Sequence, residues 1–208
     1  MNRKVAIKVT EEFVRQKVSG FDSGHDWWHI DRVRKMALFI NEQEAVTDSF
    51  TLETASLLHD IADSKFAGDN AEQQYKVIGD FMDENGMMNI KDQVIEVLRN
   101  VSYSNKKPSG NYTDPVLLIL QDADRLDAIG AIGIARAFNY GGFMNNAIYI
   151  PGDYEPKRKH TTIAHFYDKL LKLKDLMNTL TGRKLAEERH DFLLKYLEQF
   201  YKEWNFTT

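Results

Sequence analysis

The sequence predicts an all-α fold, a helical bundle formed by a single domain over residues 1–208. All four prolines lie between residues 108 and 156, so the long segments on either side lack the strongest helix breaker. In these segments apolar residues recur at i, i+3, i+4 and i+7, which places them on one helix face. A chain of 208 residues with 43% apolar content can bury a sizeable core.

Two helices are expected at about residues 28–44 and 49–61. Their inner faces show the same spacing, at Val33, Met36, Ala37 and Ile40 and at Leu52, Ala55, Ser56 and His59. Asp48 precedes the second helix and is a suitable N-cap, because its carboxylate can accept a hydrogen bond from a backbone N–H of the first turn.

Further helices are expected at about residues 70–84 and 91–102, the first of them ending at Asn85-Gly86. Pro115 suits the first turn of the next helix. That helix carries on one face Leu117, Leu120, Gln121 and Asp124.

Residues 139–160 contain Gly141-Gly142, Pro151-Gly152 and Pro156, which predict a short loop or hairpin-like excursion around 140–160. An uninterrupted apolar stripe follows, and a last helix is expected to end near Trp204. The stripe consists of Ile163, Phe166, Leu170, Leu173, Met177 and Leu180.

Charge and composition exclude several classes of function. With 31 acidic and 27 basic residues the formal charge is −4, which disfavours polymeric nucleic acid as a partner but allows a nucleotide. The absence of cysteine means that any metal must be held by His and carboxylate. The start, MNRKVAIKVTEEF, lacks the apolar run of a signal peptide, and no stretch is long enough to span a membrane. We therefore expect a cytoplasmic protein with no membrane partner, and a homo-oligomer stays open.

Three His-Asp dipeptides occur, so the dipeptide alone has little diagnostic value. His190-Asp191 follows a run of charges typical of a solvated helix face, and we assign it no function. His59 instead lies on an apolar face beside Asp60, at the carboxyl end of its helix. A carboxylate there is neither favoured by the helix dipole nor easily buried, so a neighbouring cation is expected.

Two other residues point towards the same core. His29 precedes Val33 by four residues, and Asp124 follows Leu120 by four, so each shares an apolar helix face. Two imidazoles and two carboxylates on three inner faces favour a bound ion over the alternative, two separate His–Asp hydrogen-bonded pairs. One divalent ion is expected, manganese first, with Fe, Co, Ni, Zn or Mg as alternatives, and with coordination positions open for catalysis.

The order His29, His59-Asp60 and then Asp124, in QDADRLDAIGA, resembles the H…HD…D signature of the HD-domain superfamily of metal-dependent phosphohydrolases. The runs SGHDWWHIDRV, LLHDIADSKF and DADRLDAIGAIGIARAF are similar to a subgroup of small, single-domain bacterial members, over about residues 20–185. The resemblance implies an all-α HD fold and one divalent ion on these four residues. It also implies hydrolysis of phosphate esters or anhydrides, commonly of nucleotides.

The resemblance also suggests roles for nearby aspartates. In DADRLDA, Asp124 matches the family position of the last ligand because it directly precedes Arg125, and Asp122 and Asp127 are expected to support the ligands. Other members often place a Glu three residues beyond the HD pair to position the attacking water. Here that residue is Asp63, one methylene shorter.

A phosphate substrate also needs cations. Lys65 and His25 rank first because they are close in sequence to ligands, and further candidates are Arg32, Lys157, Arg158 and Lys159. Each has a simpler alternative: His25 as a brace of its turn, Arg32 as the partner of an acid, and residues 157–159 as solvated surface.

The expected activity is metal-dependent hydrolysis of a (deoxy)nucleoside triphosphate at a phosphoanhydride bond. The alternative within enzymes is a 5′-nucleotidase or other phosphomonoesterase. The alternative from another class is a non-catalytic sensor that binds a nucleotide and a metal.

Overall fold

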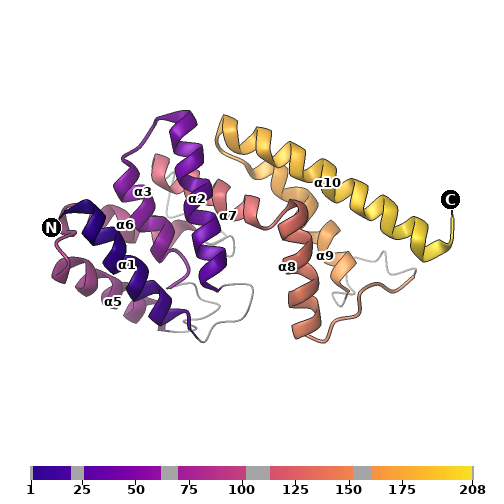
Figure 1. The fold of residues 1–208 in the computed structure, drawn as a ribbon, viewed down its shortest axis with the longest axis horizontal. Helices are drawn as coiled ribbons and strands as arrows, with labels where there is room; N and C mark the ends of the chain where they lie inside the picture. Colours follow the sequence, from indigo (N-terminus) through magenta and orange to yellow (C-terminus); the bar gives the residue numbers. More distant parts are fainter. Residues whose placement is uncertain (1, 20–25, 62–69, 102–112, 152–160, 208) are drawn as a thin grey trace. The chain divides into compact units, whose positions relative to one another are not determined.

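The computed structural model describes residues 2–19, 26–61, 70–101, 113–151 and 161–207 (Figure 1). These residues are mostly helical. They form no β-strand, only an isolated parallel bridge between Ala147 and Thr161. The predicted all-α fold is confirmed. In the described part of the chain, no helix is both long and apolar enough to cross a membrane.

The chain divides into two compact units, Met1–Ala123 and Asp124–Thr208. The boundary falls inside one continuous helix, α7, which spans Pro115–Asp127. The expectation of a single domain stays a prediction.

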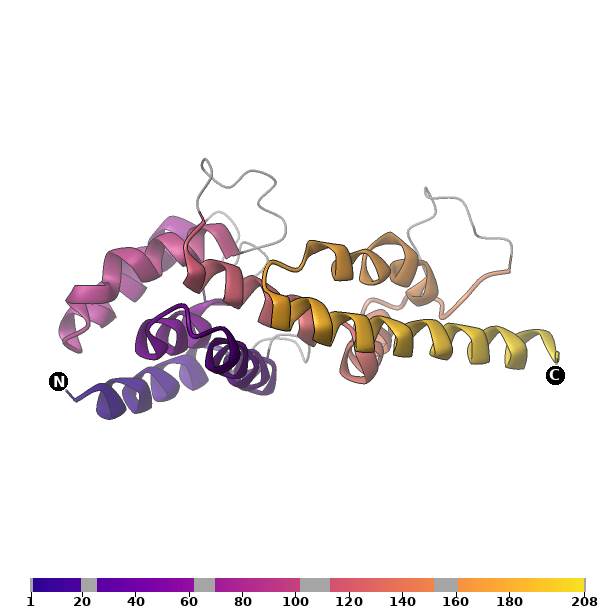
Figure 2. The same ribbon diagram turned by 90° about the horizontal axis from the view of Figure 1, so that it is seen from above.

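The first unit is organised around α3. Besides the start of α7 it contains α1 (Arg3–Lys17), α2 (Trp27–Glu44), α3 (Ser49–Leu58), α5 (Ala71–Glu84) and α6 (Met88–Val101). α3 packs against α1, α2 and α6, and α5 packs against α6 (Figures 1 and 2). α3 is buried around nearly its whole circumference, as expected of a central helix.

Several helices of this unit begin with the side-chain caps that the sequence favours. Asp48 accepts a hydrogen bond from the Thr51 N–H at 3.0 Å, which confirms it as the N-cap of α3. Asp26 accepts one from the His29 N–H at 2.9 Å and begins α2. α5 ends before Asn85, and Gly86 takes the positive φ of 66° that its turn requires. These ends agree with the predicted ones.

The predicted inner faces are buried. Val33, Ala37 and Ile40 of α2 are fully inaccessible, and Met36 beside them is half-buried. On α7, which begins at Pro115 as predicted, Leu117 and Leu120 are buried, and Gln121 donates to the Asn100 carbonyl oxygen. The hydrophobic spacing therefore identified the faces that position the site.

The second unit contains the end of α7, then α8 (Gly130–Phe143), α9 (Thr162–Asp168), a 3₁₀ helix η2 (Leu170–Leu176) and α10 (Leu180–Asn205). α10 packs against α8 and η2, and α9 packs against η2 and α8 (Figure 2). The last helix ends one residue beyond the predicted Trp204.

The apolar stripe after Thr161 is not carried by one continuous helix. α9 ends at Asp168, η2 follows, and Met177 is extended before Thr179 caps α10. Residues at i and i+3 also share a face of a 3₁₀ helix, so Leu170 and Leu173 stay buried despite the change of helix type. Leu180 is wrong as a stripe residue, since it is 73% exposed.

The expected excursion begins later than predicted. α8 continues through Gly141-Gly142 to Phe143, because neither glycine has a positive φ and both fit a helix. Residues 144–151 form no helix, and backbone hydrogen bonds from Thr162 to Ala147 and from Ile163 to Ile148 tie this segment to the start of α9. Residues 152–160 lie outside the described residues.

Candidate metal centre

His29 lies in the first turn of α2. The Asp26 carboxylate accepts the His29 backbone N–H, which fixes where the helix begins and therefore which way its first side chains point. The imidazole is 1% exposed. The local sequence thus places one imidazole inside the core.

His59 lies at the carboxyl end of a helix, α3. α3 ends at Leu58, three residues earlier than predicted, and His59 keeps helical backbone angles as its C-cap. His59 Nδ1 lies 2.8 Å from the Ser56 carbonyl oxygen. Because a carbonyl oxygen only accepts, Nδ1 carries the hydrogen, and Nε2 of the neutral ring keeps a lone pair for a metal.

Asp60 lies against both imidazoles. Its Oδ2 is 3.4 Å from His29 Nε2 and its Oδ1 is 3.3 Å from His59 Nε2, and all three side chains are buried. One carboxylate therefore serves both rings, which differs from the alternative of two separate His–Asp pairs. If Nε2 of His59 carries no hydrogen, its lone pair facing the carboxylate is repulsive unless a cation lies between them.

These separations fit a common ion. Ligand atoms bonded at roughly 2.0–2.1 Å to one ion lie about 2.9 Å apart in octahedral and about 3.4 Å apart in tetrahedral geometry. The distances from Asp60 Oδ2 to His29 Nε2 and from Asp60 Oδ1 to His59 Nε2, 3.4 and 3.3 Å, fall in this range, although each involves a different carboxylate oxygen. The cluster of possible ligands in the described residues contains Asp124 and does not include Asp60. The donor set of imidazole nitrogen and carboxylate oxygen also suits a first-row divalent metal.

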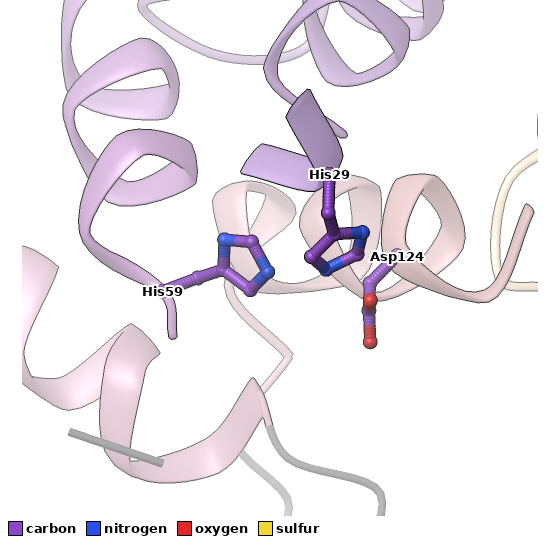
Figure 3. A group of neighbouring side chains, drawn as sticks. All are labelled: His29, His59 and Asp124. Atoms are coloured by element: carbon purple, nitrogen blue, oxygen red, sulfur yellow. The ribbon is translucent and has the colours of Figure 1, made fainter. Parts of the chain in front are cut away.

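Asp124 comes to the two imidazoles from α7 (Figure 3). Three residues, His29, His59 and Asp124, each offer one ligand atom, and these three atoms all lie within 4.8 Å of one another. The two rings meet edge to face, with centroids 5.3 Å apart. This His–His–Asp cluster could hold a divalent ion, and the three residues were all predicted as ligands.

The other two aspartates of DADRLDA have different surroundings. Asp122 is fully buried, but two helical positions turn it about 200° away from Asp124. The Asp127 carboxylate accepts a hydrogen bond from Arg136 at 2.7 Å. Neither belongs to the cluster with the two histidines. Their role in supporting the ligands stays a prediction.

The remaining predicted residues are only partly placed. Arg32 is half-buried on α2, three positions after His29, so its side chain leaves the helix on nearly the same face. The others lie outside the described residues: His25, Asp63, Lys65, Lys157, Arg158 and Lys159.

A charge network near the start of the chain was not predicted. Arg34 contacts Glu11, and it reaches Asp31 at 3.0 Å and Glu53 at 3.5 Å, so one guanidinium joins α1, α2 and α3. The pKa of Glu53 is raised above its ordinary value, chiefly by burial. The charge of Arg34 opposes this shift and the charge of Glu11 adds to it. This network fixes α2, which carries His29, against α3, which leads into His59.

The chain matches the HD domain family over residues 27–129. It is also 40% identical over 196 residues to YpgQ of Bacillus subtilis, covering 92% of this chain and 90% of that protein. The chain therefore belongs to the HD-domain family, and the resemblance seen in the sequence is confirmed.

Solved structures agree with this assignment. A crystal structure of an HD-superfamily hydrolase from Bacillus thuringiensis matches with a TM-score of 0.81 and 40% identity, covering 98% of this chain and 99% of that one. The crystal structure of Bacillus subtilis YpgQ in complex with ADP matches with a TM-score of 0.81 and 36% identity, covering 98% and 97%. The Bacillus thuringiensis protein is thus an HD-superfamily hydrolase, and the YpgQ structure contains a bound nucleotide.

Proposed function

We propose that this protein is a divalent-metal-dependent phosphohydrolase that cleaves (deoxy)nucleoside triphosphates at a phosphoanhydride bond. The observation that carries the proposal is the convergence of His29, His59 and Asp124, with Asp60 against both imidazoles. The ADP complex of the relative YpgQ supports a nucleotide as the substrate class.

The proposed ligands are His29, His59, Asp60 and Asp124, and the proposed ion is Mn²⁺. When bound, a divalent ion supplies a water of lowered pKa and polarises a phosphoryl oxygen. The protein supplies the positions of the donor atoms. The hydrogen bond from His59 Nδ1 to the Ser56 carbonyl oxygen holds that ring in one tautomer and one orientation, with Nε2 towards the site.

Other residues are proposed to act on the nucleophile and the phosphates. Asp63 accepts the proton of the attacking water, or orients that water, for in-line attack. Lys65, His25 and Arg32 neutralise the charge that develops on the phosphoryl oxygens. The cluster Lys157, Arg158 and Lys159 is proposed to bind the distal phosphates.

The test is a product assay on dATP with the full chain, first stripped of metal by a chelator and then supplied with Mn²⁺. Products of dAMP and pyrophosphate support the proposal, because the bond broken is then a phosphoanhydride. Deoxyadenosine and triphosphate would instead identify a phosphomonoesterase. Binding of Mn²⁺ and dATP without turnover would identify a sensor.

A matched pair of variants links the activity to the site. Asp60→Asn should abolish Mn²⁺-dependent turnover, because it removes a carboxylate charge that lies against both imidazoles. Asp191→Asn makes the same change in another His-Asp dipeptide, at an exposed position of α10, and should leave turnover unchanged. Equal activity of stripped and Mn²⁺-supplied protein would contradict the proposal.

A further inference from the structure

The end of α7 is held by arginines from two other helices. The last four carbonyls of an α-helix have no N–H partner within the helix. Here the Leu126 carbonyl oxygen accepts the Ile129 N–H just beyond the helix, at 3.3 Å, and a further hydrogen bond from Arg189 of α10. Arg136 of α8 donates to the Asp127 carbonyl oxygen at 3.2 Å and to the Asp127 carboxylate at 2.7 Å. Asp124 lies in the same helical turn as both carbonyls.

Arg189 passes close to the backbone at Gly130. A Cβ added at Gly130 would lie 3.0 to 3.3 Å from the side-chain carbons of Arg189, and Gly130 also has a positive φ of 74°. Glycine therefore satisfies two requirements at this position, a left-handed backbone and space for the arginine stem. The pKa of Arg189 is lowered from its ordinary value by burial, and the charges of Asp127 and Glu188 only partly oppose this shift.

We infer that Arg189 and Arg136 are positioning residues that fix the last turn of α7 and thereby place the Asp124 carboxylate for metal binding. This inference rests on the proposed metal site. A ligand must be held within about 0.5 Å of its productive position, and supporting groups typically change metal affinity 10- to 100-fold. The positive guanidinium groups are also favourable at the carboxyl end of a helix.

The alternative is that the two arginines only stabilise the fold. Arg183 provides the matched control, because it is also on α10 and also donates to backbone carbonyls, at 3.2 Å to Met177 and 3.1 Å to Asn178. Those carbonyls precede α10 and are not part of α7. Loss of Arg183 therefore removes similar hydrogen bonds to carbonyls outside the turn that carries Asp124, and it leaves the bond from Arg125 of that turn to the Leu176 carbonyl oxygen in place.

The experiment is calorimetric titration of Mn²⁺ into the metal-stripped full chain, without nucleotide. Arg189→Met should raise the Mn²⁺ Kd by roughly 10- to 100-fold, and Arg189→Lys should recover part of the loss. Arg183→Met should stay within about twofold of wild type, since the hydrogen bonds of Arg183 go to Met177 and Asn178 and not to α7. Circular dichroism spectra at the titration temperature show which variants are folded, and only those variants are titrated. Arg136→Met replaces Arg189→Met if the latter does not fold.

A second measurement tests the contribution of Gly130. If Gly130 acts by admitting Arg189, then Gly130→Ala and Arg189→Met should weaken Mn²⁺ binding through the same loss. Because alanine at Gly130 also strains the positive-φ backbone, the double variant should lose more Mn²⁺ affinity than Arg189→Met alone, but less than the sum of the two single losses. Additive losses would overturn the assigned role of Gly130.

The outcomes separate two failures. If wild-type protein does not bind Mn²⁺, the proposed function fails and this inference fails with it. If wild-type protein binds Mn²⁺ and Arg189→Met binds it equally well, only the inference is overturned. Equal weakening in Arg183→Met and Arg189→Met also overturns it, because the effect would then follow from general destabilisation.

Discussion

His59 donates its Nδ1–H to the carbonyl oxygen of Ser56 over 2.8 Å. Ser56 is in the last turn of α3, where a carbonyl has no N–H partner from the helix itself. One hydrogen bond thus satisfies the helix end and fixes the imidazole that faces the site. The end of α3 and the orientation of a proposed metal ligand therefore depend on the same hydrogen bond.

His59→Ala should weaken Mn²⁺ binding by more than about a hundredfold, because it removes a nitrogen ligand and not only a group that supports one. His190→Ala is the control, since His190 belongs to another His-Asp pair, on α10. Titration with Mn²⁺ and phosphate release from dATP measure both variants. Unchanged Mn²⁺ affinity in His59→Ala would remove His59 from the site.

Asp124→Asn and Asp122→Asn distinguish the proposed ligand from its buried neighbour. Asp124 belongs to the cluster with the two histidines, so its loss of charge should lower Mn²⁺ affinity at least tenfold. Asp122 lies on the opposite side of α7, and its substitution should change thermal stability more than Mn²⁺ affinity. The reverse order of Mn²⁺ affinities would show that Asp122 is the ligand.

The ligand faces could be predicted because they follow the hydrophobic spacing. His29, His59 and Asp124 each share a helix face with buried aliphatic residues, and that relationship is visible in the sequence. The N-cap Asp48 and the stop at Asn85-Gly86 are likewise local features. Local geometry needs no knowledge of the tertiary fold, so sequence reasoning could find these features.

Contacts between distant residues could not be predicted in this way. The approach of Arg189 to Gly130 joins positions 59 residues apart. The contacts of Arg34 with Glu11 and Glu53 depend on how three helices pack. The break between α9 and η2 is not visible in the sequence, because an apolar stripe with i, i+3 spacing is common to α- and 3₁₀-helices.

Asp48→Ala should destabilise the first unit by about 1 kcal/mol, because α3 loses its N-cap. Asp48→Asn should cost less, since an amide oxygen can still accept the Thr51 N–H. Thermal unfolding of the two variants and of wild-type protein measures the difference. Equal stability of Asp48→Ala and wild type would show that the cap contributes nothing.

The same residue should give a pH dependence. Partial burial raises the pKa of Asp48, but hydrogen bonds from the Thr51 N–H, Arg3 and the Thr51 hydroxyl outweigh it and hold the pKa below its ordinary value of 3.8. The charged form is therefore favoured by folding. Its contribution is present above pH 3.8 and is lost as the pH falls through the folded-state pKa. The difference in stability between wild type and Asp48→Asn should therefore shrink as the pH falls below 3.8 and through the folded-state pKa of Asp48. A difference that stays constant over this pH range would contradict the prediction.

Adjacent glycines of α8 should respond in opposite directions to alanine. A Cβ at Gly141 would lie 2.1 Å from the Oγ1 atom of Thr162, which is buried, whereas a Cβ at Gly142 meets nothing within 4 Å. Gly141→Ala should therefore cost roughly 1–3 kcal/mol, because α8 and α9 must move apart. Gly142→Ala should stabilise the helix by about 0.5–1 kcal/mol, because alanine has the higher helix propensity. Thermal unfolding should show the two variants on opposite sides of wild type. A similar change in both would mean that α8 does not approach Thr162 at Gly141.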